Sequence, residues 1–178
     1  GEKCNGFVRV GGDDPLVSPE GIALLTEQFV LESSTEPKTA MMYTSYNSGM
    51  PYGCAAEIFS IPYYSKVYNY ILAGNFAAFQ LKNFYLEHTK PAFLDDSICS
   101  SLGFNACKKT PVPEAFRSET LRVSVDYPLD FLIASYIANT MVANYDISYR
   151  HEDLLAHRFE LKPECRLNWD YHQDRFGE

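Results

Sequence analysis

The stretch Gly6-Phe7-Val8-Arg9-Val10-Gly11-Gly12-Asp13-Asp14-Pro15, residues 6–15, joins a short β-strand to a tight turn. Residues 6–10 are dominated by β-formers and predict the strand. The turn follows because glycine relaxes the φ restriction and proline fixes φ. Ser18 is then placed to cap a helix over residues 19–31, whose apolar side chains can form one face. The chain therefore opens as strand, turn and helix.

Working outward, the remaining pattern mixes strands and helices without a linker. Alternation or β-forming composition predicts strands over residues 39–46, 67–73, 119–125 and 157–161. Helices are expected over residues 52–59 and 130–143, residues 77–87 fit either type, and residues 95–113 resemble a loop. We expect one α+β domain spanning residues 1–178, with split mixed β-sheets, flanking helices and a polar tail over residues 166–178.

Composition narrows the functional classes. The chain has 178 residues, enough for one sizeable core, and a formal net charge of −8, which disfavours binding to a nucleic-acid backbone. No apolar run is long enough to span a membrane. Neither a P-loop nor a GxGxxG turn is present, so a Rossmann dinucleotide fold is not supported. Gly1-Glu2-Lys3 looks like the start of a trimmed or mature chain.

Cysteine spacing points to an oxidising setting rather than to a metal. No CxxC pair or Cys/His cluster has the spacing of a zinc site. A disulfide between Cys99 and Cys107 would close a short loop, and one between Cys4 and Cys165 would tie the ends together, leaving Cys54 as the unpaired thiol. These pairings predict secretion, while five reduced thiols in a cytosolic protein remain the alternative.

Three short segments carry a resemblance to a known family. They are Phe7-Val8-Arg9, Tyr43-Thr44-Ser45 and Arg117-Ser118-Glu119, and Pro128 follows the last one at a matching offset. In order and spacing they resemble the catalytic domain of bacterial-toxin-type mono-ADP-ribosyltransferases, the class of pertussis toxin and heat-labile enterotoxin. The resemblance covers about the first three quarters of the chain, and it implies a secreted toxin or effector with NAD as its substrate.

The resemblance also implies roles for individual residues. Glu119 would stabilise the oxocarbenium-like transition state, and Arg9 would clamp the pyrophosphate, helped by the backbone amides of Gly11 and Gly12. Thr44 and Ser45 would orient these two side chains. Aromatic side chains would stack on the nicotinamide, and the candidates are Tyr43, Tyr46 and Phe59. No metal is implied.

Two departures from the family pattern affect the expected chemistry. Arg117 stands where the family has Glu or Gln, and its positive charge would repel an arginine acceptor. Tyr43 replaces the first serine of a Ser-Thr-Ser segment. The acceptor, a host binding partner and any delivery subunit therefore stay open. An NAD glycohydrolase using the same site, and a non-catalytic disulfide-stabilised secreted binding protein, are the alternatives.

Overall fold

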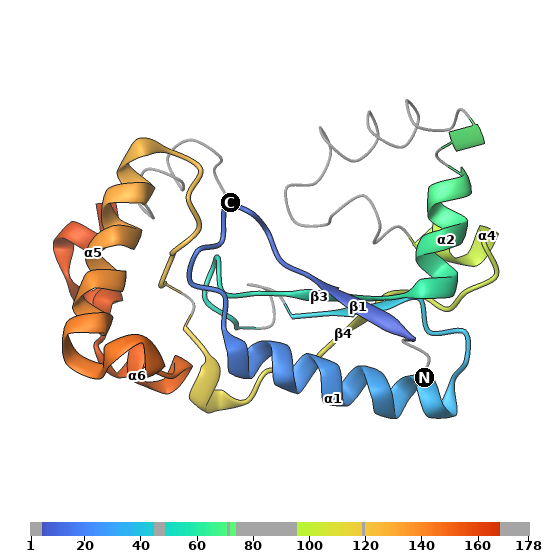
Figure 1. Cartoon of the computed structure of the whole chain (residues 1–178), viewed down its shortest axis with the longest axis horizontal. Coiled ribbons are helices and arrows are strands. Elements are labelled where there is room, and N and C mark those ends of the chain that lie inside the picture. Colours follow the sequence, from blue (N-terminus) through green and yellow to red (C-terminus); the bar gives the residue numbers. More distant parts are fainter. Residues whose placement is uncertain (1–4, 45–48, 71, 74–95, 119, 168–178) are drawn as a thin grey trace. The chain divides into compact units, whose positions relative to one another are not determined.

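The computed structural model describes residues 5–44, 49–70, 72–73, 96–118 and 120–167, and its elements mix helices with a β-sheet (Figure 1). The expected α+β class is confirmed. The chain forms two compact units, each assembled from three segments. Unit 1 contains residues 1–9, 26–43 and 57–109, and unit 2 contains residues 10–25, 44–56 and 110–178.

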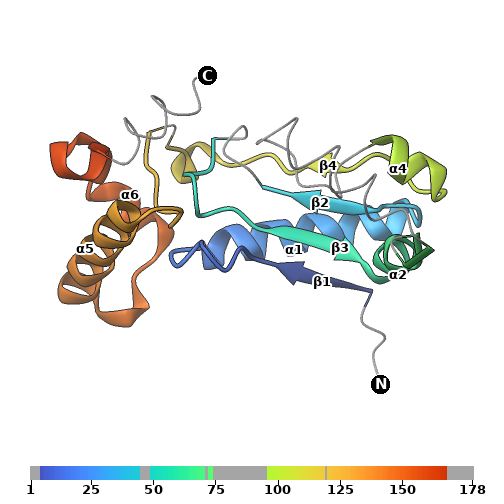
Figure 2. The same cartoon turned by 90° about the horizontal axis from the view of Figure 1, so that it is seen from above.

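A four-stranded mixed sheet lies at the centre of unit 1. Its strands are β1 (Gly6–Arg9), β2 (Met41–Tyr43), β3 (Glu57–Ser60) and β4 (Lys108–Lys109), in the order β1-β3-β2-β4 (Figure 2). β3 pairs antiparallel with both β1 and β2, while β2 and β4 run parallel. The middle position of β3 explains why Ile58 and Phe59 are buried.

Helices cover this sheet with aromatic and aliphatic side chains. α1 (Pro19–Thr35) contributes Phe29, whose ring lies so close to Gly6 that a Cβ there would be 2.7 Å from Phe29 Cε1. α2 (Ile61–Tyr70) follows β3 directly and buries Tyr63 and Val67, one helical turn apart. With α4 (Asp96–Ser101), these elements form a core that also contains Phe59 and Cys99.

Unit 2 is built around α5 (Pro128–Tyr145), which is joined by the shorter α6 (His151–Ala156). α5 buries Ile133, Ile137 and Met141 against side chains from several loops, including Leu16 and Val123. A buried Arg122 joins these loops to α5. Its Nη2 atom contacts the carboxylates of Asp126 and, at 3.3 Å, Asp130.

Several predicted elements match the structure. β1 and β2 lie within the ranges expected for them, and α5 contains the helix expected over residues 130–143. Ser18 caps α1, because its Oγ atom accepts a 2.9 Å hydrogen bond from Gly21 N.

Four other predictions are wrong. The expected helix over residues 52–59 is a turn and a loop that lead into β3, and the expected central strand over residues 67–73 includes the end of helix α2. The expected strand over residues 157–161 includes a 3₁₀ turn, Phe159–Leu161. The expected strand over residues 119–125 is reduced to a bridge between Tyr52 and Arg122. Residues 77–87 lie outside the described part of the chain.

Candidate functional site

The turn after β1 brings two carboxylates together within unit 2. If Gly11 carried a Cβ atom, that atom would lie 2.5 Å from Asp13 Oδ1 and 2.5 Å from Asp14 Oδ2. The two oxygens are therefore separated by no more than twice that distance. Only the absence of a side chain at Gly11 leaves room for this arrangement.

Backbone hydrogen bonds hold residues 11–14, here named the acidic turn, in place. Asp14 N donates to Gly11 O at 3.3 Å, which closes the turn itself. Val125 N donates to Asp13 O at 2.8 Å and anchors the turn to a segment distant in sequence. That segment leads into α5. The position of the acidic turn therefore depends on how the segment before α5 is held.

A buried charge network supports the segment that carries Val125. Asp130 Oδ2 accepts hydrogen bonds of 2.9 Å from the backbone N–H groups of Asp126 and Tyr127. The Arg122 guanidinium lies 4.4 Å from the centre of the Tyr52 ring. Burial opposes the charge on Arg122, but its bonds to Asp126 and Asp130 prevail and raise its pKa.

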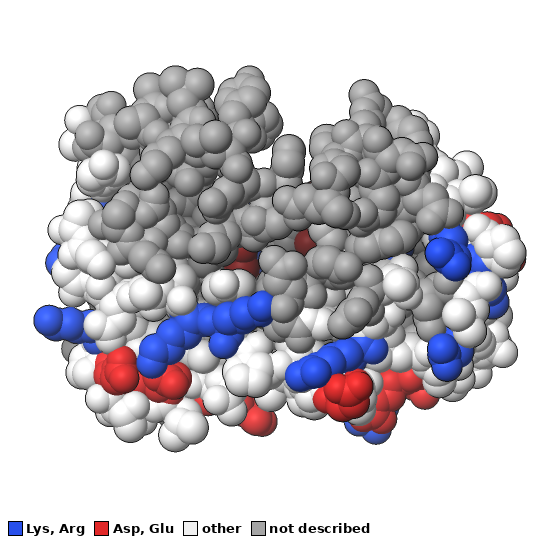
Figure 3. All heavy atoms as spheres, turned by 180° about the vertical axis from the view of Figure 1, so that it is seen from behind, with Lys and Arg blue, Asp and Glu red and all other residues white. Residues whose placement is uncertain are grey.

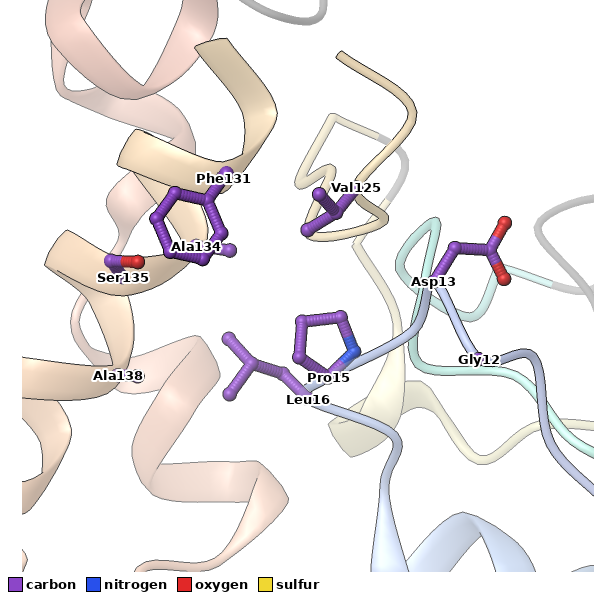
Figure 4. Close-up of a pocket in the computed structure, with 9 residues that line it drawn as sticks. All are labelled: Gly12, Asp13, Pro15, Leu16, Val125, Phe131, Ala134, Ser135 and Ala138. Atoms are coloured by element: carbon purple, nitrogen blue, oxygen red, sulfur yellow. The ribbon is translucent and has the colours of Figure 1, made fainter. Parts of the chain in front are cut away.

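A cavity of about 530 Å³ adjoins the acidic turn (Figure 4). This volume is typical of small-molecule sites. Phe131 and Ser135 of α5 form one wall, while Pro15 and Leu16 lie opposite, and the Asp13 carboxylate points away from α5. The lining residues are Gly12, Asp13, Pro15, Leu16, Val125, Phe131, Ala134, Ser135 and Ala138.

The α5 wall carries no formal charge. No Asp, Glu, Lys or Arg occurs between Phe131 and Tyr145, and the side chain of Phe131 is 61% exposed. The cavity therefore suits an uncharged portion of a ligand, whereas the acidic turn beside it suits a cation.

The acidic turn has the donor chemistry for a hard divalent cation. Mg²⁺ prefers oxygen ligands and is commonly held by one or two carboxylates together with substrate phosphates. Within the described ranges, no cluster of three or more His, Cys, Asp or Glu residues could hold a metal. Asp13 and Asp14 would thus need oxygens from water or from a ligand to complete a coordination shell.

The residues predicted from the sequence take mainly structural positions in unit 1. Arg9 faces Glu57 across β1 and β3, with Arg9 Nη1 2.7 Å from Glu57 Oε2. Phe59 is buried and stacks on Phe7 with ring centres 5.5 Å apart, while Tyr43 ends β2 and packs against the core.

The predicted residues of unit 2 are also engaged. The Thr44 hydroxyl accepts a 3.0 Å hydrogen bond from Ala56 N, and Thr44 is buried. Arg117 Nε donates to Val112 O at 2.9 Å, and its Nη1 pairs with Glu114 at 3.2 Å. Ser45 and Glu119 lie outside the described residues. Of the predicted set, Gly11 and Gly12 belong to the acidic turn.

Comparison with known proteins gives a structural similarity. No protein-family model and no curated protein sequence matches the chain. Among solved structures, the chain is similar to a cytidylyltransferase from Leptospira borgpetersenii serovar Hardjo-bovis (strain JB197). The TM-score is 0.54 and the identity 11%, and the similarity covers 92% of this chain and 59% of that chain. The chain thus spans less than two thirds of the length of its structural neighbour.

This similarity overturns the predicted function. Because the fold matches that of a cytidylyltransferase, ADP-ribose transfer and NAD hydrolysis are wrong as predictions. The described cysteines carry thiols. The similarity tests neither secretion nor disulfide pairing, and both stay predictions. Within the part of the chain that the structure describes, no helix has the length and apolar character needed to cross a bilayer.

Proposed function

We propose that this chain binds a nucleoside triphosphate together with a divalent cation, as part of a protein that transfers a nucleotidyl group. The fold similarity to a cytidylyltransferase supports the reaction class and makes CTP the first nucleotide to test. The convergence of Asp13 and Asp14 over Gly11 carries the proposal within this chain, because it supplies two oxygen donors at one point.

Charge explains why a cation is required. The chain has a net charge of −8, and a triphosphate adds several more negative charges. On the face shown in Figure 3, the visible basic and acidic side chains lie next to one another rather than forming a basic patch. A bound divalent cation supplies the positive charge that stabilises the phosphate oxygens during transfer. Asp13 and Asp14 are the residues that would hold it.

The transfer itself follows ordinary phosphoryl chemistry. An acceptor oxygen attacks the α-phosphorus, the bond from that phosphorus to the bridging oxygen breaks, and pyrophosphate leaves. The contribution of this chain is positioning: the hydrogen bond from Val125 N to the backbone Asp13 O fixes the acidic turn beside the cavity. The cavity wall of Phe131 and Ser135 would receive an uncharged part of the bound substrate.

Nucleotide binding by the full chain tests this proposal. We expect CTP with Mg²⁺ to raise the melting temperature, CTP with EDTA to leave it nearly unchanged, and ATP, GTP and UTP to act more weakly. Asp13→Asn and Asp14→Asn should each weaken CTP–Mg²⁺ binding at least about tenfold by calorimetry. Glu27→Gln is the matched control, because it removes the same charge from an exposed position on α1.

Two outcomes would contradict the proposal. One is the absence of any thermal shift with all four triphosphates in the presence of Mg²⁺. The other is binding that Asp13→Asn and Asp14→Asn weaken no more than Glu27→Gln does, since the carboxylates of the acidic turn would then have no part in it.

A further inference from the structure

A pair of thiols lies in contact in unit 1, remote in sequence from the acidic turn. Cys99 Sγ, from α4, is 3.4 Å from Cys107 Sγ, which immediately precedes β4. A disulfide requires an S–S distance of about 2.05 Å, so a small side-chain movement would bring the two sulfur atoms to bonding distance. The backbone between them is already folded back into a loop.

The 99–107 loop is held by contacts that do not involve sulfur. Phe104 N donates to Cys99 O at 2.9 Å, and Asn105 N donates to Lys38 O at 2.9 Å. Lys66 Nζ donates to Leu102 O at 2.8 Å. The thiol pair is therefore preorganised by the reduced fold, and closing the bond would require little additional ordering of the chain.

The two thiols differ in their access to solvent. Cys99 is completely buried and its Sγ lies 3.4 Å from the Tyr63 hydroxyl, which belongs to the core of unit 1. Cys107 is only partly buried. A dissolved oxidant would thus reach Cys107 first, while Cys99 is positioned to resolve the product.

We propose that Cys99 and Cys107 form a redox-sensitive pair that closes a disulfide when the protein meets a hydroperoxide. The Cys107 sulfur attacks the peroxide, the O–O bond breaks, and Cys107 becomes a sulfenic acid while the hydroperoxide is reduced to an alcohol or water. Cys99 Sγ then attacks Cys107 Sγ, the S–O bond breaks, and water leaves with the thiol proton. Dithiol reagents reverse the reaction.

The new bond would fasten α4 to the beginning of β4. Cys107 precedes Lys108, which pairs with Met42 of β2 and forms an ion pair with Glu32 at 2.6 Å. Oxidation would therefore stabilise this edge of unit 1 by restricting the unfolded chain. The inference does not depend on nucleotide binding.

Peptide mapping of the full chain after hydrogen peroxide treatment tests the pair. Leu102 and Phe104 are chymotrypsin sites between the two cysteines, so a disulfide would keep two chymotryptic peptides joined until reduction. We expect the joined peptides in the natural sequence and a mass loss of about 2 Da in the intact protein. Oxidation should also raise the melting temperature, by roughly 5 °C.

Two variants separate the proposed chemistry from general oxidation. In Cys107→Ser, Cys99 should remain open to alkylation after unfolding, no peptides should be joined, and peroxide should leave the melting temperature unchanged. Cys54→Ser removes a buried thiol from unit 2 and should behave like the natural sequence.

Three results would overturn the proposal. Both thiols could remain alkylatable after peroxide treatment. Cys107 could instead advance to sulfinic or sulfonic acid while Cys99 stays reduced, or either cysteine could join to a different cysteine. Each of these would show that the 3.4 Å contact does not direct oxidation.

Discussion

Asp13 and Asp14 are consecutive in sequence, yet each places one carboxylate oxygen 2.5 Å from the same point beside Gly11. Consecutive side chains more often diverge, so the turn that bends them together is the distinctive feature of this segment. The neighbouring Gly12 has open space at the equivalent point, with nothing within 4 Å. A side chain at position 11 would therefore collide with the carboxylates, whereas one at position 12 would not.

A methyl group at Gly11 should weaken the acidic turn as a cation site. In Gly11→Ala, the new Cβ would push apart the carboxylates of Asp13 and Asp14. We expect Mn²⁺ or Mg²⁺ affinity in the presence of CTP to fall at least about tenfold by calorimetry. Gly12→Ala is the matched control and should bind almost as the natural sequence does. Equal affinities in the two variants would show that the convergence of the carboxylates is unimportant.

The cavity wall can be tested with two adjacent residues of α5. Phe131 and Leu132 are similarly exposed, at 61% and 64%, but only Phe131 lines the cavity. Phe131→Ala should reduce CTP affinity several-fold through the loss of apolar contact, whereas Leu132→Ala should have little effect. Calorimetric titration of both variants measures the difference. A larger loss in Leu132→Ala would place the ligand elsewhere.

The Arg122–Asp130 pair should contribute strongly to the stability of unit 2. Both side chains are buried, and removal of one partner leaves an unbalanced charge in the core. We expect Asp130→Asn and Arg122→Met each to lower the free energy of unfolding by about 3 kcal/mol in urea titrations. The double variant should lose less than the two single losses combined. Fully additive losses would argue against direct coupling.

Acidification should destabilise the fold through His151. The pKa of His151 is lowered, mainly by burial, although its 3.0 Å hydrogen bond to Phe116 O and the nearby carboxylates of Glu20 and Glu152 act in the opposite direction. The neutral ring is therefore preferred in the folded state. Stability from this residue is fully present above the unfolded-state pKa of about 6.5 and declines as the pH falls below it.

Urea titrations between pH 8 and pH 5 measure this dependence. His151→Gln should flatten the decline below pH 6.5 relative to the natural sequence. The Arg150 side chain near Glu20 also faces this region, so the comparison is best made at moderate salt. An unchanged slope in His151→Gln would assign the acid sensitivity to other groups.

Local sequence signals predicted the helices whose first turn is marked by a capping residue or a proline. Ser18 caps α1 through Gly21 N, and Pro128 stands at the first position of α5. Residues 61–70 also begin with a capping serine and an early proline, but the alternating aromatic side chains favoured a strand over residues 67–73 in the prediction. Ser60 Oγ accepts a bond from Tyr63 N at 3.3 Å, and Pro62 lies in the first turn of α2. The cap was a better guide than the alternation.

The strand β3 illustrates what local patterns could not provide. The small residues Gly53, Ala55 and Ala56 precede β3 and favour no strand by themselves, whereas residues 57–60 become extended through pairing with β1 and β2. Gly53 has a φ of +94°, and a Cβ there would lie 2.3 Å from Ser124 N. This constraint comes from a segment about seventy residues away, which no local window contains.

The site was missed for a related reason. Asp13 and Asp14 were recognised as turn residues, but the cation site that we propose for them depends on the anchor from Val125 and on the wall supplied by Phe131. Arg9, in contrast, looked chemically suggestive and is paired with Glu57 directly across the sheet. Sequence reasoning identified charged and hydroxyl groups, whereas their partners were set by long-range packing.

The path of the backbone limits how this protein can be dissected. Each compact unit takes its residues from three separated stretches, so the polypeptide alternates between them at residues 9/10, 25/26, 43/44, 56/57 and 109/110. A single truncation point cannot yield either half intact. Circularly rearranged or split versions would need several new junctions, and most of the polypeptide must be synthesised before either half can be completed.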